Sequence, residues 1–350
     1  MTAVPAIVSG QAVRPGERAR IDIPLPNLYT QTPVSMPVHV VHGRRPGPRL
    51  FVTAALHGDE INGVEIIRRL LLHHGLDHLH GTLLAVPVVN VYGYIRQSRY
   101  LPDRRDLNRS FPGSDRGSLT ARLAATLTNE VVAGATHGVD LHTGALHREN
   151  LPQVRAALDS CEAMPALARA FGTPVILDAE LRSGSLRATA AERCIPVLVY
   201  EAGEALRLDE FAVRAGLRGV LGVMRHLGMI GGRAGSRVIP RNPVVARASL
   251  WVRAPQSGVL LSTTPLGAHV KAGDRLGILA DPLRSADEHV IAPVDGIVIG
   301  RTNLPLVTEG EALYHIARFG EPAAAAALVQ QYRDALDPDE SEDAEELVIL

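Results

Sequence analysis

The chain has 350 residues, a length typical of about two domains. Its 46 % apolar and 21 % charged residues are ordinary for a soluble globular protein and exclude a mostly disordered one. The 36 basic and 37 acidic residues leave a net charge of −1, which argues against binding to nucleic acid or a membrane surface through a basic excess.

The N-terminus and the cysteines indicate where the protein resides. The first 18 residues contain no basic segment followed by an apolar run and a cleavage site, and no apolar stretch approaches the ~20 residues of a membrane span. Cys161 and Cys194 are too few for a disulfide framework or a four-thiolate zinc site. We therefore expect a cytoplasmic protein with reduced thiols.

The N-terminal part begins with a strand-rich segment, residues 1–49, in which apolar residues alternate at 21–25 and 38–41. Residues 50–55 have the apolar pattern of a fully buried strand, and an amphipathic helix is predicted at 62–73. A second buried strand follows at 81–88. A strand, a helix and a strand at this spacing predict a parallel pair within an α/β sheet.

The same alternation of elements continues to residue 227. The further predictions are helices at 119–133 and 209–227 and strands at 138–142, 173–177 and 196–200. A glycine-rich stretch, 228–235, is predicted to be a linker. We therefore predict a catalytic α/β domain over residues 1–232.

After the linker the sequence contains an internal repeat. An Ala-Pro-x-x-Gly unit followed by a Val-x-x-Gly-x-x-Leu unit occurs at 251–276 and again at 289–313. Short strands and turn residues at this spacing indicate a small β-sandwich or barrel. We predict an all-β domain over 236–320 and a helical, acidic and partly disordered tail over 321–350.

Polar residues follow the predicted strands of the first domain. His57 and Glu60 come after the strand at 50–55, and His142 closes the strand at 138–142. Open α/β proteins bind ligands at the carboxyl ends of parallel strands, and hydrolytic zinc sites commonly use three protein ligands. We predict that these three residues bind one Zn²⁺ per chain. Asp140 is expected to orient the ligands without binding the metal itself.

Two more segments carry candidate chemistry. Arg99 and the run Asp106-Leu107-Asn108-Arg109 form a loop that suits an acidic substrate, since arginine binds carboxylates and polarises carbonyl oxygens; a solvated loop held by salt bridges is an equal alternative. Glu201 either simply ends the strand at 196–200 or acts as a general base that passes a proton to a leaving amine. Glu204 is expected to face solvent.

Taken in order, these motifs resemble the succinylglutamate desuccinylase/aspartoacylase family, zinc amidohydrolases related to zinc carboxypeptidases. The motifs are His57-Gly-Asp-Glu60, Arg99-Tyr100, Asp106-Leu-Asn108-Arg109, Asp140-Leu-His142-Thr-Gly and Glu201-Ala-Gly, and the resemblance covers residues 50–227. It implies a zinc-carboxypeptidase-like α/β fold with a mixed, largely parallel sheet flanked by helices.

The resemblance also implies roles for individual residues. His57, Glu60 and His142 would bind zinc, Glu201 would be the general base and acid, and Arg99 would polarise the scissile carbonyl. Asn108 and Arg109 would hold the substrate carboxylate, and Arg187 would be a further substrate-binding arginine.

The C-terminal repeat resembles the barrel-sandwich hybrid of biotinyl and lipoyl carrier domains. A carrier needs a lysine at the hairpin between the two halves, but residues 279–284 contain none, and the chain's single lysine, Lys271, comes earlier. We therefore expect this domain to be a lid or an oligomerisation element, which leaves a homo-oligomer possible.

The leading hypothesis is a zinc-dependent deacylase that hydrolyses the amide of a small, carboxylate-bearing N-acyl amino acid. One alternative is a metallocarboxypeptidase for short peptides, because the same metal ligands would serve and Arg109 would bind a terminal carboxylate. Another is a non-catalytic carrier or binding protein, with Lys271 as its only candidate for an attached group.

Overall fold

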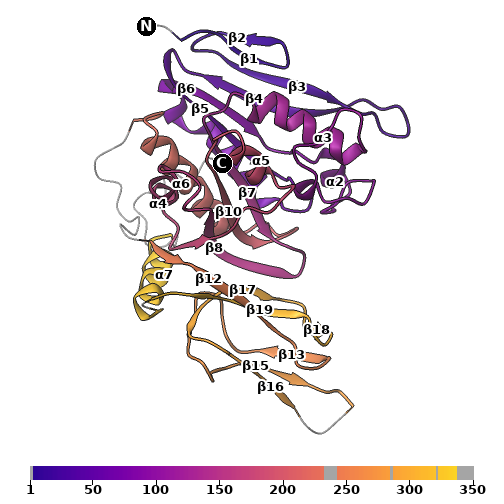
Figure 1. Cartoon of the computed structure of the whole chain (residues 1–350), viewed down its shortest axis with the longest axis vertical. Helices are drawn as coiled ribbons and strands as arrows, with labels where there is room; N and C mark the ends of the chain where they lie inside the picture. The colour runs from indigo at the N-terminus through magenta and orange to yellow at the C-terminus, as the bar shows by residue number, and fades with distance from the viewer. Residues whose placement is uncertain (1–2, 232–242, 284–286, 321, 337–350) are drawn as a thin grey trace.

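The computed structural model describes residues 3–231, 243–283, 287–320 and 322–336 (Figure 1). A short hairpin, β1 (Ala6–Val8) with β2 (Gln11–Val13), opens the chain. Most of the other described strands belong to one large mixed sheet that runs the length of the molecule.

The main path of this sheet has the strand order β12-β19-β17-β8-β10-β7-β5-β6-β4-β3. In chain order these strands are β3 (Arg18–Leu25), β4 (Val34–His42), β5 (Arg45–Ala54), β6 (His80–Val86), β7 (His137–Gly144), β8 (Arg148–Ala156), β10 (Val197–Glu204), β12 (Ala248–Arg253), β17 (Gly296–Thr302) and β19 (Ala312–Arg318). Three strands attach beside the path: β9 (Val175–Asp178), β11 (Val244–Ala246) and β14 (His269–Val270).

The centre of the sheet is parallel and its flanks are antiparallel. Strands β6, β5, β7 and β10 pair in parallel, so their carboxyl ends reach the same edge of the sheet. Strands β3 and β4 on one flank and β8 on the other pair antiparallel with their neighbours. The predicted mixed α/β sheet is confirmed. Along its main path the parallel pairs are confined to the centre, and beside that path β9 pairs in parallel with β8 and with β11.

Helices cover both faces of the parallel strands. On one face, α1 (Asn62–Leu72), α4 (Met164–Phe171) and α6 (Glu210–His226) share a buried apolar cluster with Leu50 and Val52 of β5. On the other, α3 (Leu119–Leu127) and α5 (Leu186–Ala191) share a cluster with Phe51. Alternate residues of β5 thus enter opposite cores, which is why its buried half, residues 50–54, is almost entirely apolar.

The predicted elements up to residue 227 are confirmed, with their ends displaced by a few residues. The predicted helix at 119–133 is α3 followed by a π-helical turn, Thr128–Val132. Strand β8 was not predicted. Its sequence lacks a regular apolar alternation and contains Pro152, which cannot donate a ladder hydrogen bond and lies where the β8–β10 register shifts.

The predicted repeat is visible in the pairing of the C-terminal strands. A second sheet has the order β16-β15-β13-β18, formed by β13 (Gly258–Ser262), β15 (Arg275–Ala280), β16 (Glu288–Ile291) and β18 (Leu306–Val307). Each half of the repeat contributes two strands to this sheet and two to the large one. A buried apolar cluster that includes Val252, Leu260 and Ile316 lies between the two sheets.

The two predicted domains are linked by the large sheet itself, because β17 pairs antiparallel with β8. The predicted helical tail begins as α7 (Pro322–Leu336). The acidic residues 337–350 and residues 232–235 of the predicted linker lie outside the described residues. In the described part of the chain, no helix is both long and apolar enough to cross a membrane.

Candidate metal centre and active-site cleft

The loop between β5 and α1 carries the first two candidate ligands. Ala55, directly after β5, has a φ of +47°, which turns the chain out of the sheet. Gly58 then lies against the α2 segment (Val91–Ile95): a Cβ at this position would lie 2.0 Å from the carbonyl carbon of Gly93. The close contact therefore requires glycine between His57 and Glu60.

The three predicted ligands converge into one buried cluster. The Glu60 carboxylate lies between two imidazoles, with Oε1 2.8 Å from His57 Nδ1 and Oε2 2.6 Å from His142 Nδ1. The three side chains are between 2 % and 5 % exposed. One ligand atom from each residue lies within 4.8 Å of the others, so the cluster could hold a metal ion.

The outer nitrogen of each imidazole contacts a second carboxylate. His142 Nε2 lies 2.8 Å from Asp140 Oδ2, and His57 Nε2 lies 3.1 Å from Asp106 Oδ1. This pattern fixes the ring orientation and the tautomer of a metal-ligating histidine. The expected contact of Asp140 is confirmed, whereas the contact of Asp106 was not predicted.

The pKa values of these residues follow from their mutual contacts. Burial raises the pKa of the Glu60 carboxyl, but His57 and His142 lower it by more, so it falls well below its usual range. Burial lowers the pKa of His142, but Asp140 and Glu60 reverse the effect and raise it well above its usual value. The carboxylates of the cluster therefore favour a positive charge between them. A bound cation would supply that charge in place of the protons on the imidazoles.

The donor set fits Zn²⁺. Two imidazole nitrogens and one carboxylate are the ligands of many hydrolytic zinc sites, and each imidazole here has the outer carboxylate found in such sites. Both Nδ1 atoms face Glu60, so the three ligand atoms point toward one another.

Arg99 lies directly beside this cluster. Its Nη1 atom is 3.3 Å from Glu60 Oε1 and 3.2 Å from His57 Nδ1, while Nη2 donates to Asp106 Oδ2 at 2.9 Å. Asp106 thus contacts both Arg99 and His57. The guanidinium is held next to the position that a metal ion would occupy.

The other predicted substrate residues lie in the same cleft. Asn108 Oδ1 accepts a hydrogen bond from the Leu186 backbone at 3.0 Å, which attaches its loop to α5. Arg109 is exposed, and its Nη1 atom donates to the Asn108 carbonyl.

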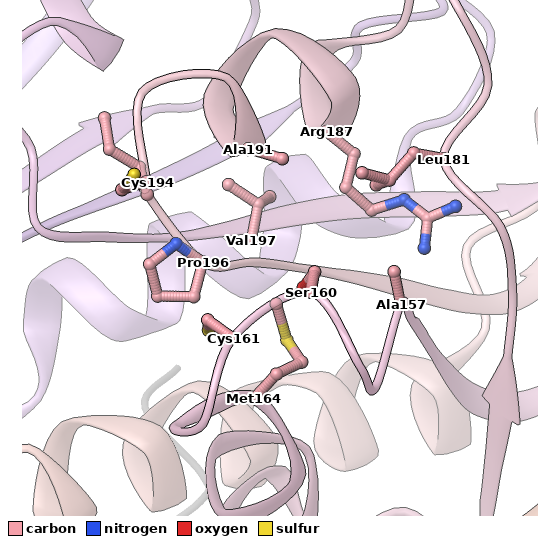
Figure 2. A pocket seen from close by; sticks show the side chains of 11 residues that line it. Ala157, Ser160, Cys161, Met164, Leu181, Arg187, Ala191, Cys194, Pro196 and Val197 are labelled. Atoms are coloured by element: carbon pink, nitrogen blue, oxygen red, sulfur yellow. The ribbon is translucent and has the colours of Figure 1, made fainter.

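Arg187 lines two cavities. Its guanidinium donates to the carbonyls of Ala179 and Glu180 at 3.1 and 2.9 Å, and burial together with Arg155 and Arg182 lowers its pKa to about 10. One cavity is the cleft that His57, Glu60 and His142 also line. The other is about 20 Å³, and Figure 2 shows Arg187 extending beside Leu181, across that cavity from Cys194. It is the size of one water, too small for a substrate.

Glu201 lies in the cleft at a bulge of β10. The pairings of β10 with β7 and with β8 both shift in register just after this residue, and its backbone is paired with that of His142. Its carboxylate accepts a hydrogen bond from Asn150 Nδ2 at 2.8 Å and lies 3.3 Å from Arg155 Nη1. Bulges commonly re-aim a side chain next to an active site.

Glu204 corrects one prediction. Its side chain is buried rather than solvent-facing: it accepts hydrogen bonds from the His147 backbone and from Asn303 Nδ2, at 3.1 and 2.9 Å. The side chain does not face solvent because Asn303, in the chain directly after β17, covers it.

The cleft has a volume of about 830 Å³, and both halves of the chain line it. The residues that line it include the candidate metal ligands, Arg99 and Glu201, as well as Ser249, Trp251 and Arg253 of β12. The Trp251 ring stacks on His315 with a centroid separation of 4.6 Å, and the Arg148 guanidinium lies 5.4 Å from the Trp251 ring centre. Burial, with Arg155 nearby, lowers the pKa of His315 to about 3, so this imidazole is neutral.

Comparison with known families identifies the fold and the motifs together. The family profile described as "Succinylglutamate desuccinylase/Aspartoacylase catalytic domain" matches residues 46–227, more than half of the chain. The chain belongs to the succinylglutamate desuccinylase/aspartoacylase family. The matched region of this family member contains the His57–Glu60–His142 cluster, Arg99 and Glu201, and it ends before β12.

Relatives of this family member match over nearly all of their length. N-alpha-acetyl-L-2,4-diaminobutyric acid deacetylase from Halomonas elongata is 30 % identical over 305 residues, covering 82 % of this chain and 87 % of that protein. The structure of a succinylglutamate desuccinylase/aspartoacylase from Rhodobacter sphaeroides has a TM-score of 0.78 at 26 % identity, covering 91 % and 99 % of the two chains. The product-bound ectoine utilization protein EutE (DoeB) from Ruegeria pomeroyi shares the fold, with a TM-score of 0.78, 24 % identity and coverage of 91 % and 98 %.

Several cleft residues of this family member were not predicted from the sequence. Asn150 and Arg155 lie on β8, whose sequence carries no regular strand pattern. Trp251 and Arg253 lie beyond the motifs, in the repeat. Asp106, which contacts His57 beside the cleft, did have a local signal, since it opens the run that contains Asn108 and Arg109.

Proposed function

We propose that this family member is a zinc-dependent hydrolase that cleaves the amide bond of a small N-acyl amino acid. The observation that carries the proposal is the buried His57–Glu60–His142 cluster in the same cleft as Arg99 and Glu201. The deacetylase named for the Halomonas elongata relative supports it. His57, Glu60 and His142 would hold one Zn²⁺, which when bound supplies Lewis-acid polarisation of a carbonyl and makes water more acidic near neutral pH.

The roles of the other residues follow from what each side chain can donate or accept. Glu201 accepts a proton from the attacking water on a carboxylate oxygen and returns it to the departing amine nitrogen. Asn150 and Arg155 engage one oxygen each, so both oxygens keep a free lone pair. Arg99, 3.3 Å from Glu60, offers positive charge to the carbonyl oxygen as that oxygen becomes negative.

The charge of the cleft supports a carboxylate-bearing substrate. Asn108, Arg109 and Arg187 would bind the substrate carboxylate. Among the described residues that line the cleft, eight are arginines and five are acidic, and Glu60 and Asp140 are already engaged by His142. The arginines are Arg99, Arg109, Arg148, Arg155, Arg182, Arg187, Arg247 and Arg253. Their excess favours an anionic substrate.

The test is amine release from a panel of N-acetyl and N-succinyl amino acids, including Nα-acetyl-2,4-diaminobutyrate, with zinc-loaded protein. Glu201→Gln is expected to lower kcat by a factor of about 10² to 10⁴, because it removes the proton acceptor. Zinc content, measured by elemental analysis, is expected to stay at one per chain. Full activity in the variant would remove Glu201 from the mechanism, and loss of zinc would make it a ligand instead.

A metallocarboxypeptidase is the second candidate, because its chemistry uses the same residues. The position of β12 along the cleft disfavours long peptides. Faster cleavage of a dipeptide series than of N-acyl amino acids would establish the peptidase. A carrier would need a group on Lys271, and an unmodified intact mass after expression in the native host would contradict it.

A further inference from the structure

Asn150 occupies an unusual place in the large sheet. On β10 its backbone partner is Gly203, and on β17 its partner is Gly300. Glycine therefore flanks this polar residue on both sides, so no cross-strand side chain competes for the space beside it. The Asn150 side chain is free to extend along the sheet face to Glu201, two residues before Gly203.

The contact between Asn150 and Glu201 is buried and specific. Asn150 is 6 % exposed, and its Nδ2 atom donates to Glu201 Oε2 at 2.8 Å. Arg155 Nη1 lies 3.3 Å from the other carboxylate oxygen. Two donors from one strand, β8, thus hold the two oxygens of the candidate base.

Gly300 of β17 sets the position of Asn150. A Cβ at Gly300 would lie 2.9 Å from Asn150 Oδ1 and 3.2 Å from His315 Cβ. The first distance is shorter than real side chains tolerate, so any larger residue at 300 would displace the Asn150 amide. The C-terminal repeat is thereby connected to Glu201 through the backbone pairing of Gly300 with Asn150 and through the Asn150 side chain.

We propose that Asn150 is a positioning residue for Glu201, and that the C-terminal segment holds it through the Gly300–Asn150 pairing. The proposal rests on the proposed role of Glu201 as the base. It assigns the C-terminal repeat a task in catalysis besides forming a wall of the cleft: with Asn150 in place, Glu201 keeps the one orientation from which it reaches the attacking water.

The first experiment separates positioning from structure. Asn150→Ala keeps the backbone ladder and removes only the amide, whereas Asn150→Asp keeps the shape and places a second carboxylate against Glu201. Both are expected to lower kcat by a factor of about 10 to 100 with little change in KM, because a misplacement of about 1 Å can cost about 10² in rate. Wild-type kcat in both variants would overturn the proposal.

Glu149→Gln is the matched control. Glu149 is adjacent on β8, and its contact with Arg301 at 3.3 Å belongs to the same β8–β17 pairing. Loss of the Glu149–Arg301 ion pair weakens the pairing of β8 with β17 but leaves the Asn150–Glu201 contact intact, so kcat is expected to stay at the wild-type value. An equal fall in kcat for this control would mean that any weakening of the pairing lowers activity, which would overturn the proposal.

A double-mutant cycle tests the route through Gly300. Gly300→Ala is expected to lower kcat in the wild type and to have little further effect in the Asn150→Ala background, where the amide it would displace is gone. Additive losses would show that Gly300 acts independently of Asn150 and would overturn the route. Melting temperatures of all variants identify any that fail to fold, in which case Asn150→Asp and Gly300→Ala carry the test.

Failure of this proposal is distinguishable from failure of the proposed function. If Glu201→Gln abolishes turnover but Asn150→Ala does not lower it, only the positioning role fails. If the wild type releases no amine, crystal structures of the wild type and Asn150→Ala decide the matter without activity. A displaced Glu201 carboxylate in the variant supports positioning, and an unchanged one overturns it.

Discussion

The imidazole of His142 is held between two carboxylates that have different tasks. Glu60 lies 2.6 Å from Nδ1, on the side of the candidate metal centre, and Asp140 lies 2.8 Å from Nε2 on the other side. Asp140 is itself fixed, because Thr53 Oγ1 donates to its second oxygen at 2.7 Å. A buried chain from Thr53 to Asp140 to His142 therefore aims one ligand nitrogen.

Removing the charge of Asp140 is expected to weaken metal binding without unfolding the protein. Asp140→Asn should lower zinc affinity by a factor of about 10 to 100, because the amide no longer favours the required tautomer and ligand basicity. Competition with a chelator measures the affinity, and circular dichroism checks the fold.

Asp178→Asn is the control for this change. Asp178 also lines the cleft, but its carboxylate accepts from the Leu158 backbone at 3.1 Å. Equal zinc affinities for wild type and Asp140→Asn would contradict the orienting role of Asp140.

At the scale of elements, α1 and α6 are joined by ion pairs as well as by their apolar faces. Arg69 of α1 contacts Glu65 one turn earlier and Glu210 at the start of α6, each at 2.7 Å. Hydrogen bonds from Arg68 and, against the effect of burial, from Arg69 lower the pKa of Glu65 to about 2. These ion pairs connect α1 and α6, the helices that follow strands β5 and β10 in the chain.

Glu65 is expected to contribute stability that depends on pH. Because its folded pKa is lowered, the contribution is complete above the unfolded value of about 4.3 and is lost as pH falls toward 2. Glu65→Gln should lower the free energy of unfolding near pH 7 by about 1 kcal/mol, since its partners are partly exposed. Urea unfolding between pH 3.5 and 7 should show this difference shrinking below pH 4.5.

Glu192→Gln controls for loss of one negative charge, because Glu192 is exposed and has no ion pair among the described residues. A wild-type-minus-variant difference for Glu65→Gln that stays constant with pH would mean that the carboxylate contributes no charge-dependent stability.

At the scale of the molecule, the candidate metal centre joins distant parts of the chain. His57 and Glu60 come from the β5–α1 loop and His142 from β7, while the large sheet continues through β8 into the C-terminal strands. A ligand that binds only the folded state stabilises it by mass action. Metal occupancy should therefore affect the unfolding of the whole catalytic region.

Zinc removal is expected to lower the melting temperature. At a free zinc concentration of 100 times Kd, bound metal adds about 2.7 kcal/mol to stability. Calorimetry with a chelator, and again after zinc is restored, measures the shift in the transition of the catalytic region. His142→Ala should abolish the shift, and His269→Ala, at a histidine outside the cleft, should retain it. A melting temperature independent of zinc would contradict the site.

Local patterns in the sequence were enough to predict most strands and helices of the catalytic region and the edge of the sheet at which the motifs meet. Residues 50–55 and 196–200 predict buried strands because a strand that is covered on both faces has a nearly continuous run of apolar residues. Parallel strands share one carboxyl edge, so the polar residues after them were expected to meet, as His57, Glu60 and His142 do. Both predictions depend only on residues that are close together in the sequence.

The register of β8, and the side chains that it places beside Glu201, follow from long-range packing. Asn150 is 51 residues from Glu201, and its other neighbour, Gly300, lies on a strand of the C-terminal repeat. No local pattern encodes the pairing of β8 with β10 and β17, because this pairing depends on packing between segments far apart in the chain. The cleft wall formed by Trp251 and Arg253 has the same origin: it exists because the large sheet continues from β8 into the repeat.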